Sequence, residues 1–332
     1  MGSKHRLLPW IAEHLAGLTF DTALDAFSGS GCVSYLLKCL GKEVTANDAL
    51  LFAQRLVEAS VVNSKRRLDA STLRRLLAPS TARAEGFIAQ NFGGIFFELE
   101  DLRFLDRVWE RLDGTRGEAT RALAIAALIR SAMKRQPRGV FTVAGDPSRY
   151  KDGRRDLRLT LEEHFLESVQ VFNELVFDSG RRHQALCGDV FEVPGSFDLV
   201  YLDPPYVPRS DDNCYVKRYH FLEGLASRWR APGTTILSSS KVRKIPKRFT
   251  PFAYRKTSLD AFARLFDKFR ESIIVLSYSS NGYPDRDVLV ELLERRKRRV
   301  RVAERPHRYH FGTHARVAAA RSLVQEYLIV AE

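Results

Sequence analysis

The chain has 332 residues, 45% of them hydrophobic, and a formal net charge of +13 at pH 7. This length and hydrophobic content suit about two domains with a sizeable core, and no run of roughly 18 apolar residues is present, which excludes a membrane-spanning helix. The excess of basic residues favours a polyanionic partner such as nucleic acid.

The first predicted element is a short apolar strand over residues 22–27, which leads into the glycine-rich turn 28–31 and a helix over 32–40. Glycines let backbone N–H groups approach a ligand closely, and the start of a helix favours a negative group. The turn matches neither the dinucleotide fingerprint nor a phosphate loop, so the ligand could be the carboxylate of a methionine moiety. The alternative is a plain strand-to-helix turn.

A second strand is predicted over residues 42–48 and ends in Asp48. This acid follows the glycine turn by roughly 20 residues, the spacing at which doubly wound folds place a carboxylate on ribose hydroxyls. The alternative is that Asp48 caps the helix that follows.

The stretch 65–180 interrupts the alternation of strands and helices, and residues 118–134 predict a helix with a buried apolar face. A basic turn follows, which contains Arg135, Gln136 and Arg138. Arg and Gln side chains pair with the edges of guanine and adenine, so these residues either read bases or only contact phosphates.

The remaining predicted strands lie at 184–190, 197–203, 233–240, 271–279 and 326–330, and a further possible strand at 300–304 leaves the pairing near the carboxyl terminus open. Helical stretches between most of the strands favour an α/β fold with a doubly wound, mostly parallel sheet of seven strands. We expect residues 1–64 and 181–332 to form this domain, and residues 65–180 to form an inserted, mainly helical domain.

The strand at 197–203 delivers the tetrapeptide Asp203-Pro204-Pro205-Tyr206 to the carboxyl edge of the sheet, where ligands bind. The amino group of adenine is a poor nucleophile, and two hydrogen-bond acceptors would return electron density to its nitrogen. The Asp203 carboxylate and the Pro204 carbonyl can supply them, and Tyr206 offers a face on which a base can stack. A capped, proline-rich turn is the structural alternative.

Aromatic and basic residues are interleaved after the tetrapeptide, among them Lys217, Arg218 and Tyr219. They could hold a displaced base or fill the gap that it leaves. Alternatively, Tyr219 and Phe221 could pack on the sheet from an amphipathic helix.

The segment 241–256 contains basic residues and no acid. Because it follows the predicted strand at 233–240, we expect Lys241, Arg243 and Lys244 to contact phosphates near the active edge. The unbroken basic run 295–299 is as readily a solvated helix face.

Taken in order, these motifs resemble those of the adenine-specific DNA methyltransferases of the alpha arrangement, the group that includes the bacterial Dam methylase. Residues 187–190 are similar to the motif whose acid contacts the adenine ring of the cofactor, and residues 276–282 to a strand that borders the target-base pocket. The resemblance implies the following cofactor-binding residues: Gly2, Ser3, Lys4, Asp25, Phe27, Ser28, Gly29, Gly31, Asp48, Asp189 and Val190.

The resemblance also implies an activity. S-adenosyl-L-methionine would donate a methyl group to the exocyclic amino nitrogen of an adenine flipped out of double-stranded DNA, and the insert would recognise the target sequence. An RNA adenine methyltransferase, a methyltransferase for the cytosine amino group and a non-enzymatic DNA-binding protein are the alternatives. We expect a monomer or weak dimer, which can act beside a separate, cognate restriction endonuclease.

The four cysteines form no Cys-x-x-Cys pair and fit reduced thiols, and the amino terminus lacks the apolar stretch of a secretory signal, so we expect a cytoplasmic protein. His307, His310 and His314 lie among arginines, with no carboxylate or cysteine at matching spacing, which argues against a metal site.

Overall fold

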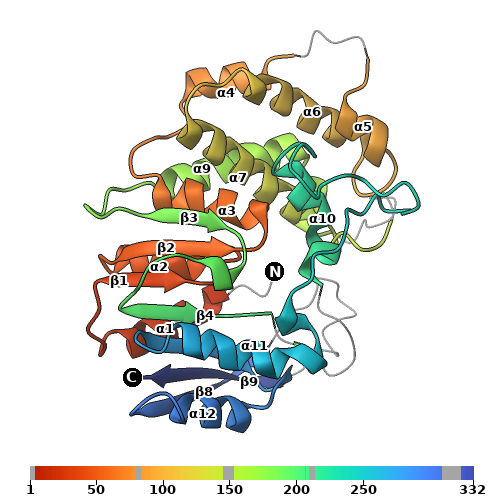
Figure 1. The fold of residues 1–332 in the computed structure, drawn as a ribbon. Coiled ribbons are helices and arrows are strands. Elements are labelled where there is room, and N and C mark those ends of the chain that lie inside the picture. Colours follow the sequence, from red (N-terminus) through yellow and green to blue (C-terminus); the bar gives the residue numbers. More distant parts are fainter. Residues whose placement is uncertain (1–3, 80–83, 145–152, 206, 209–213, 309–322) are drawn as a thin grey trace.

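The computed structural model describes residues 4–332 apart from 80–83, 145–152, 206, 209–213 and 309–322. Within these residues a mixed sheet of seven strands has the order β3-β2-β1-β4-β6-β9-β8 (Figure 1). The strands are β1 (Thr22–Asp25), β2 (Glu43–Asp48), β3 (Gln184–Cys187), β4 (Leu199–Leu202), β6 (Ile273–Ser279), β8 (Val300–Arg308) and β9 (Leu323–Ala331).

Strand direction divides the sheet into two parts. The neighbours β3, β2, β1, β4 and β6 all run parallel, as strands joined through helical crossovers do. β9 runs antiparallel to both β6 and β8, which makes the sheet mixed. The predicted α/β class and a sheet of seven strands are confirmed, although the seventh strand is β8, which begins with the possible strand at 300–304.

Residues 233–240 do not form a strand, which corrects the prediction. They follow an irregular path in which the N–H of Leu237 donates to the carbonyl of Lys244 at 2.8 Å. β4 pairs directly with β6, so the sheet has no position between them, and Ile236 packs against the helical core instead. A short apolar run does not by itself specify which core receives it.

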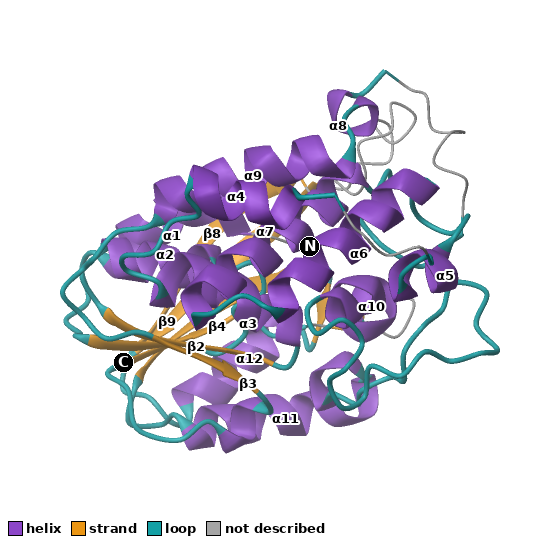
Figure 2. Cartoon of the chain, turned by 90° about the horizontal axis from the view of Figure 1, so that it is seen from above, coloured by secondary structure: helices purple, strands orange, loops and turns teal. Residues whose placement is uncertain are grey.

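Helices cover both faces of the sheet, as a doubly wound fold requires (Figure 2). One face is covered by α1 (Leu8–Leu15), α2 (Cys32–Cys39) and the end of α3 (Leu51–Val57). The other face is covered by α11 (Arg255–Lys268) and α12 (Arg286–Glu294). Successive strand residues point to opposite faces, so Ala23 enters the first core and Leu24 the second.

A group of helices stands beside the β3 edge of the sheet (Figure 1). It contains α4 (Ala70–Leu77), α5 (Phe87–Phe92), α6 (Leu99–Asp113), α7 (Glu118–Arg135), α8 (Arg155–Arg158) and α9 (Leu161–Leu175). The helix predicted over 118–134 is confirmed as α7. Every residue from 123 to 129 in α7 is buried, as expected of a helix that is apolar on all sides.

These helices share one continuous core with their neighbours. The core includes Phe52 and Leu56 of α3 and Phe221 of α10 (Tyr215–Leu225), the helix that follows the tetrapeptide. Residues 65–180 therefore pack directly against both α3 and α10.

Short elements complete the chain: η1 (Lys4–Leu7), η2 (Glu58–Val62), η4 (Val190–Glu192), η5 (Pro251–Ala253), and the paired strands β5 (Val207–Pro208) and β7 (Gly282–Tyr283). Among the helices that the structure describes, none is both long enough and apolar enough to cross a membrane.

Gly224 of α10 offers a test of this packing, because a Cβ added there would come within 2.1 Å of the Trp229 indole. Trp229 has a φ of 55° and packs against Phe92 and Phe221, so its ring has little room to move. We predict that Gly224→Ala lowers the free energy of unfolding, measured with urea, by about 1–3 kcal/mol. Gly17→Ala, where the new Cβ meets nothing within 4 Å, is the control and should change it by less than about 0.5 kcal/mol. Equal effects of the two substitutions would contradict the prediction.

Candidate active site

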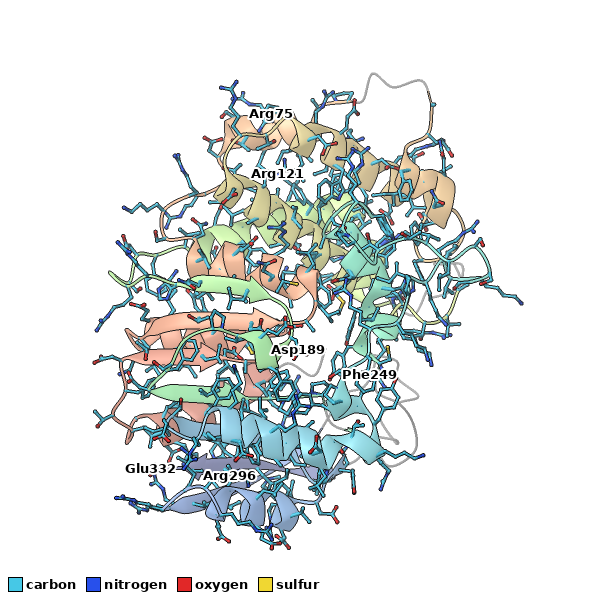
Figure 3. The ribbon with its side chains drawn as sticks, viewed as in Figure 1. Arg75, Arg121, Asp189, Phe249, Arg296 and Glu332 are labelled. Carbon is cyan, nitrogen blue, oxygen red and sulfur yellow. The ribbon has the colours of Figure 1, made fainter. Side chains whose placement is uncertain are left out.

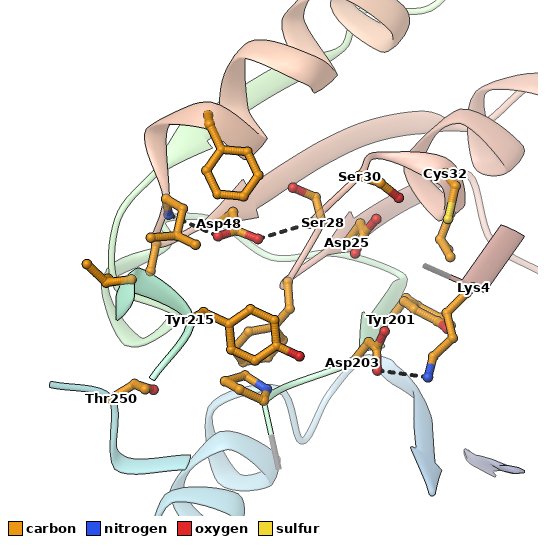
Figure 4. Close-up of a pocket in the computed structure, with 18 of the residues that line it drawn as sticks. Lys4, Asp25, Ser28, Ser30, Cys32, Asp48, Tyr201, Asp203, Tyr215 and Thr250 are labelled. Atoms are coloured by element: carbon orange, nitrogen blue, oxygen red, sulfur yellow. Dashed lines mark hydrogen bonds and ion pairs between the residues drawn. The ribbon is translucent and has the colours of Figure 1, made fainter. Parts of the chain in front are cut away.

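A pocket opens at the carboxyl ends of β2, β1 and β4, which are neighbours in the sheet (Figure 4). It encloses about 1070 Å³, part of which is open to solvent. The glycine turn, the first residues of α3, Asp203, Pro205 and residues 248–250 line it. Two motifs that lie far apart in the sequence thus share one pocket.

Asp25 ends β1 and is buried in this pocket. Burial is the main cause that raises its pKa to about 7, and the nearby carboxylates of Asp203 and Asp48 act in the same direction. Its Oδ2 accepts a hydrogen bond of 2.6 Å from the Ser34 hydroxyl of α2. Its Oδ1 and the Ser28 hydroxyl are buried and have no hydrogen-bond partner among the described residues. Buried polar atoms of this kind are expected where a ligand supplies the partner.

Two glycines shape the turn that follows Asp25. Gly29 and Gly31 have φ values of 51° and 75°, in the left-handed region that favours glycine. A Cβ on Gly31 would also come within 3.1 Å of the Val57 side chain in α3. The predicted strand, glycine turn and helix are confirmed, and Phe27 lines the pocket beside them.

Asp48 is the last residue of β2, and its side chain forms a hydrogen bond with the glycine turn. Its Oδ2 accepts from the N–H of Gly29 and its Oδ1 from the N–H of Leu50, both at 2.9 Å. Burial outweighs these bonds and raises the pKa of Asp48 to about 6. The bond to Leu50 does not make Asp48 a helix cap, because Leu50 is itself the N-cap of α3 and its side chain forms no capping hydrogen bond. Each carboxylate oxygen has a second lone pair, so a ligand hydroxyl can still be bound.

Asp203 follows the last residue of β4 and reaches the same pocket. Its Oδ1 lies 3.2 Å from the ammonium of Lys4, the interaction drawn in Figure 4. Burial raises the pKa of Asp203 to about 6; the positive charge of Lys4 opposes this rise, and the negative charge of Glu326 adds to it. A carboxylate with this pKa is largely ionised at neutral pH and can accept hydrogen bonds.

The other residues of the tetrapeptide and of the amino-terminal motif are only partly described. Pro204 is buried, and Pro205 lines the pocket. Tyr206, Gly2 and Ser3 lie outside the described residues.

Asp189 and Val190 do not line the pocket, although Asp189 lies at the carboxyl end of the strands (Figure 3). Asp189 is exposed, and its Oδ1 caps η4 by accepting from the N–H of Phe191 at 3.0 Å. Val190 is buried beneath it in the core. None of the residues 276–282 lines the pocket either; of these, Leu276 and Tyr278 are buried in the sheet core.

The aromatic and basic stretch that begins α10 was predicted to hold a displaced base, but sequence reasoning did not place Tyr215 itself or residues 248–250 in this pocket. Tyr215 and Phe249 both line it, and Phe249 is 69% exposed and stacks on Tyr254 with ring centroids 5.4 Å apart. The basic composition of 241–256 indicated this segment but not which of its residues reach the pocket.

Glu223 of α10 also contributes to this region, and no sequence pattern indicated it. It is fully buried, and its carboxylate accepts from the N–H groups of Leu51 and Phe52 at 3.1 and 3.2 Å. Arg248 pairs with it at 3.0 Å and also donates to the carbonyl of Ala49 at 2.8 Å. These contacts join α10 and the 241–256 segment to the residues immediately after Asp48.

Burial corrects three of the predicted DNA contacts. Arg135 is 8% exposed and pairs with Asp101 at 3.0 Å, and Gln136 is also 8% exposed. Tyr219 is 4% exposed, and its ring packs near Phe52 of α3 in the helical core and not on the sheet as the amphipathic-helix alternative had it. These side chains have little surface left for a duplex, because the helical core already surrounds them.

The other predicted DNA contacts keep more surface. Arg243 also donates to the carbonyl of Asn91 at 3.2 Å, which ties its segment to α5. The exposed or half-buried residues of this set are Arg138, Lys217, Arg218, Lys241, Arg243 and Lys244.

In the described part of the chain, no group of three or more His, Cys, Asp or Glu side chains is arranged to hold a metal ion. His307 lies in β8, whereas His310 and His314 are outside the described residues. The four cysteines are free thiols.

Comparison with known proteins gives this site a context. Residues 1–278 match the sequence model of the D12 class N6 adenine-specific DNA methyltransferases. The chain is 29% identical to the Type II methyltransferase M2.HphI of Haemophilus parahaemolyticus, over 93% of this chain and 90% of that protein. It is 24% identical to the modification methylase LlaI of Lactococcus lactis subsp. lactis, over 89% of this chain but 48% of that protein.

The match covers most of the chain, and the fold and pocket agree with it. The protein therefore belongs to the D12 class N6 adenine-specific DNA methyltransferases, and it is an adenine-specific DNA methyltransferase. The predicted resemblance is confirmed.

The raised pKa of Asp25 makes stability depend on pH. Between pH about 4 and 7 the folded protein holds a proton on Asp25 that the unfolded chain has released, so its contribution to the free energy of unfolding is lost as pH rises. We predict that this free energy, measured with urea on the ligand-free protein, falls more steeply over this range in the wild type than in Asp25→Asn.

Asp198→Asn is the control for this measurement, because hydrogen bonds from Thr22 and Asp21 lower the pKa of Asp198. Its ionisation lies below the tested range, so this variant should keep the wild-type slope. If Asp25→Asn also keeps the wild-type slope, Asp25 does not titrate as described.

Proposed function

We propose that this enzyme transfers a methyl group from S-adenosyl-L-methionine to the N6 amino group of an adenine that is flipped out of duplex DNA into the pocket beside Asp203. The observation that carries the proposal is the placement of Asp203 in one pocket with the glycine turn 28–31. A pocket at the carboxyl edge of an α/β sheet is where such folds bind their ligands.

The residues of the pocket fit this methyl donor, which supplies an electrophilic methyl group on a sulfonium centre when bound. Asp25 Oδ1 and the Ser28 hydroxyl, which have no partner among the described residues, would form hydrogen bonds with polar groups of the donor's methionine moiety. The turn at Gly29 and Gly31 allows close approach of backbone N–H groups, and Asp48 would accept from ribose hydroxyls. Asp189, at the sheet edge, would contact the adenine ring of the donor.

The chain's own contribution to the reaction is orientation and electrostatics. The Asp203 carboxylate and the Pro204 carbonyl would accept the two hydrogens of the target amino group, and Tyr206 would stack on the base. These acceptors stabilise the positive charge that develops on nitrogen as it is alkylated. Asp203 need not be a strong base, because the amine becomes acidic as the new bond forms.

Duplex DNA would dock on the exposed cations around the pocket, with residues 65–180 as the target-recognition region. Arg138 follows α7 in this region, and Lys241 lies in the 241–256 segment whose Arg248 reaches the pocket. One relative is named as a Type II methyltransferase and the other as a modification methylase, names that suit restriction–modification. We therefore propose that the enzyme acts beside a separate cognate endonuclease. A monomer or weak dimer is proposed from the sequence alone.

Replacement of Asp203 tests the proposed chemistry. Asp203→Asn keeps the shape of the side chain but lacks the negative charge, so we predict that kcat falls by at least about 100-fold. The dissociation constant for S-adenosyl-L-methionine, measured by calorimetry, should change by less than about threefold. Transfer of a labelled methyl group to DNA is the readout.

Asp260→Asn, at an acid of α11 whose side chain is 75% exposed, is the matched control and should retain wild-type turnover. Normal turnover by Asp203→Asn would refute the assignment of this carboxylate.

Two arginines of one turn test the proposed DNA face. For Arg138→Ala we predict weaker binding to duplex DNA and a slope of log Kd against log salt concentration that is smaller by about 1, because one phosphate contact is lost. Arg135→Ala should leave that slope unchanged but lower the melting temperature, because Asp101 then loses its partner. The proposed face is wrong if the salt slope responds to Arg135 and not to Arg138.

A further inference from the structure

We infer that Glu326 is a positioning residue for methyl transfer, because it holds the ammonium of Lys4 against the Asp203 carboxylate. Glu326 lies in β9, outside residues 1–278 that match the family. The inference rests on the proposed role of Asp203 as the acceptor for the target amino group.

The geometry of three charged groups carries the inference. The Lys4 Nζ lies 3.2 Å from Asp203 Oδ1 and 3.2 Å from Glu326 Oε2. The side chains of Lys4 and Glu326 are only 5% and 0% exposed, whereas that of Asp203 is 20% exposed. One buried cation therefore bridges an inner carboxylate and a carboxylate that reaches the pocket.

The register of the sheet explains how these groups meet. β6 lies between β4 and β9, with Leu276 opposite Leu202 and Ser279 opposite Glu326. Glu326 thus comes to the same edge of the sheet as Asp203, although it approaches on the reversed strand. A strand in the opposite direction can place a side chain at this edge near its own beginning, and no crossover helix is required.

Burial makes the bridge necessary. A carboxylate without solvent contact is stable in its ionised form only when it is paired, and Lys4 provides that pairing. A lysine side chain has a flexible four-carbon stem and three donors, so one carboxylate alone would leave its ammonium free to move around that partner. Two carboxylates on different strands fix its position.

The consequence for Asp203 is geometric. Its Oδ1 already accepts from Lys4, so Oδ2 is the oxygen with more capacity left to accept from the target amino group. Glu326 is not among the residues that line the pocket, so it acts on the reaction through Lys4. Without Glu326, the ammonium can shift toward Asp203 and compete for both of its oxygens.

If Glu326 acted only through its charge, its removal would not lower kcat. The negative charge of Glu326 raises the pKa of Asp203, so its removal makes that carboxylate easier to ionise. If only ionisation mattered, loss of this charge would leave activity at neutral pH unchanged or slightly higher. A fall in kcat together with easier ionisation therefore separates positioning from charge.

Other titratable or charged groups of the described residues also act on this cluster. They are Asp25 and Tyr201, which interact with Asp203, and His307 of β8, which interacts with Glu326 and Lys4 and also with Arg6 and Arg305.

The decisive experiment compares Glu326→Gln with wild type in steady-state methylation of DNA. We expect kcat to fall roughly 10–100-fold, while KM for S-adenosyl-L-methionine and for DNA stays within about twofold. The acidic limb of the kcat–pH profile should move to lower pH, a change that a merely structural role would not cause. Glu326→Asp should recover part of kcat. Glu304→Gln, at a surface carboxylate of β8 that pairs with Arg286, is the control and should match wild type.

A second measurement does not depend on activity. Lys4→Met leaves two carboxylates, Asp203 and Glu326, without the cation between them, so its melting temperature should fall. Adding Glu326→Gln to Lys4→Met should restore part of that loss, while turnover stays low. If the two substitutions instead lower the melting temperature additively, the bridge does not exist in solution and the inference is overturned.

The outcomes also separate this inference from the proposed function. Wild-type kcat and an unmoved pH profile in Glu326→Gln overturn the inference but leave the role of Asp203 intact, since that role fails only if Asp203→Asn is active. If Glu326→Gln does not fold, kcat of Glu326→Asp decides: a fall with unchanged KM values supports positioning, and wild-type kcat overturns it.

Discussion

The active pocket depends on a single constraint: three adjacent parallel strands each end in or next to an acid. β2 ends in Asp48, β1 ends in Asp25, and Asp203 directly follows β4. Because these neighbouring strands are parallel, their carboxyl ends lie at one edge of the sheet. Burial raises the pKa of each carboxyl group, to about 6 or 7. The fold must therefore compensate one buried and two half-buried acids that share one pocket.

Each acid is compensated by a different kind of donor. Asp25 accepts a hydrogen bond from a hydroxyl of α2, and Asp48 accepts from two backbone N–H groups. Asp203 forms an ion pair with the Lys4 ammonium. The backbone donors fix the glycine turn, and the ammonium fixes the acid that is proposed to act on the substrate. Of these three acids, only Asp25 keeps a buried carboxylate oxygen without a partner among the described residues, which suits a site that a ligand completes.

α10 connects this pocket to the helical region. The N–H of Phe141, in the segment after α7, donates to the carbonyl of Arg218, and His220 Nε2 donates to the carbonyl of Phe141 at 2.7 Å. One turn further along, Glu223 holds the beginning of α3 beside Asp48. The helix that follows the tetrapeptide is thus bonded both to the proposed reader of DNA and to the start of α3 beside the pocket.

The sequence by itself determined the α/β class and the glycine turn, and it placed Asp48 and Asp203 at strand ends, because these features depend on local pattern and on the rule that parallel strands end at one edge. Asp25 was implied by the family resemblance. Only the tertiary structure decided that 233–240 stays outside the sheet and that Arg135, Gln136 and Tyr219 are buried. It also decided that Lys4, Glu223 and Glu326 pair as they do. Partners in these contacts lie up to 322 residues apart in the chain, and local pattern carries no information about which distant groups will share a buried site.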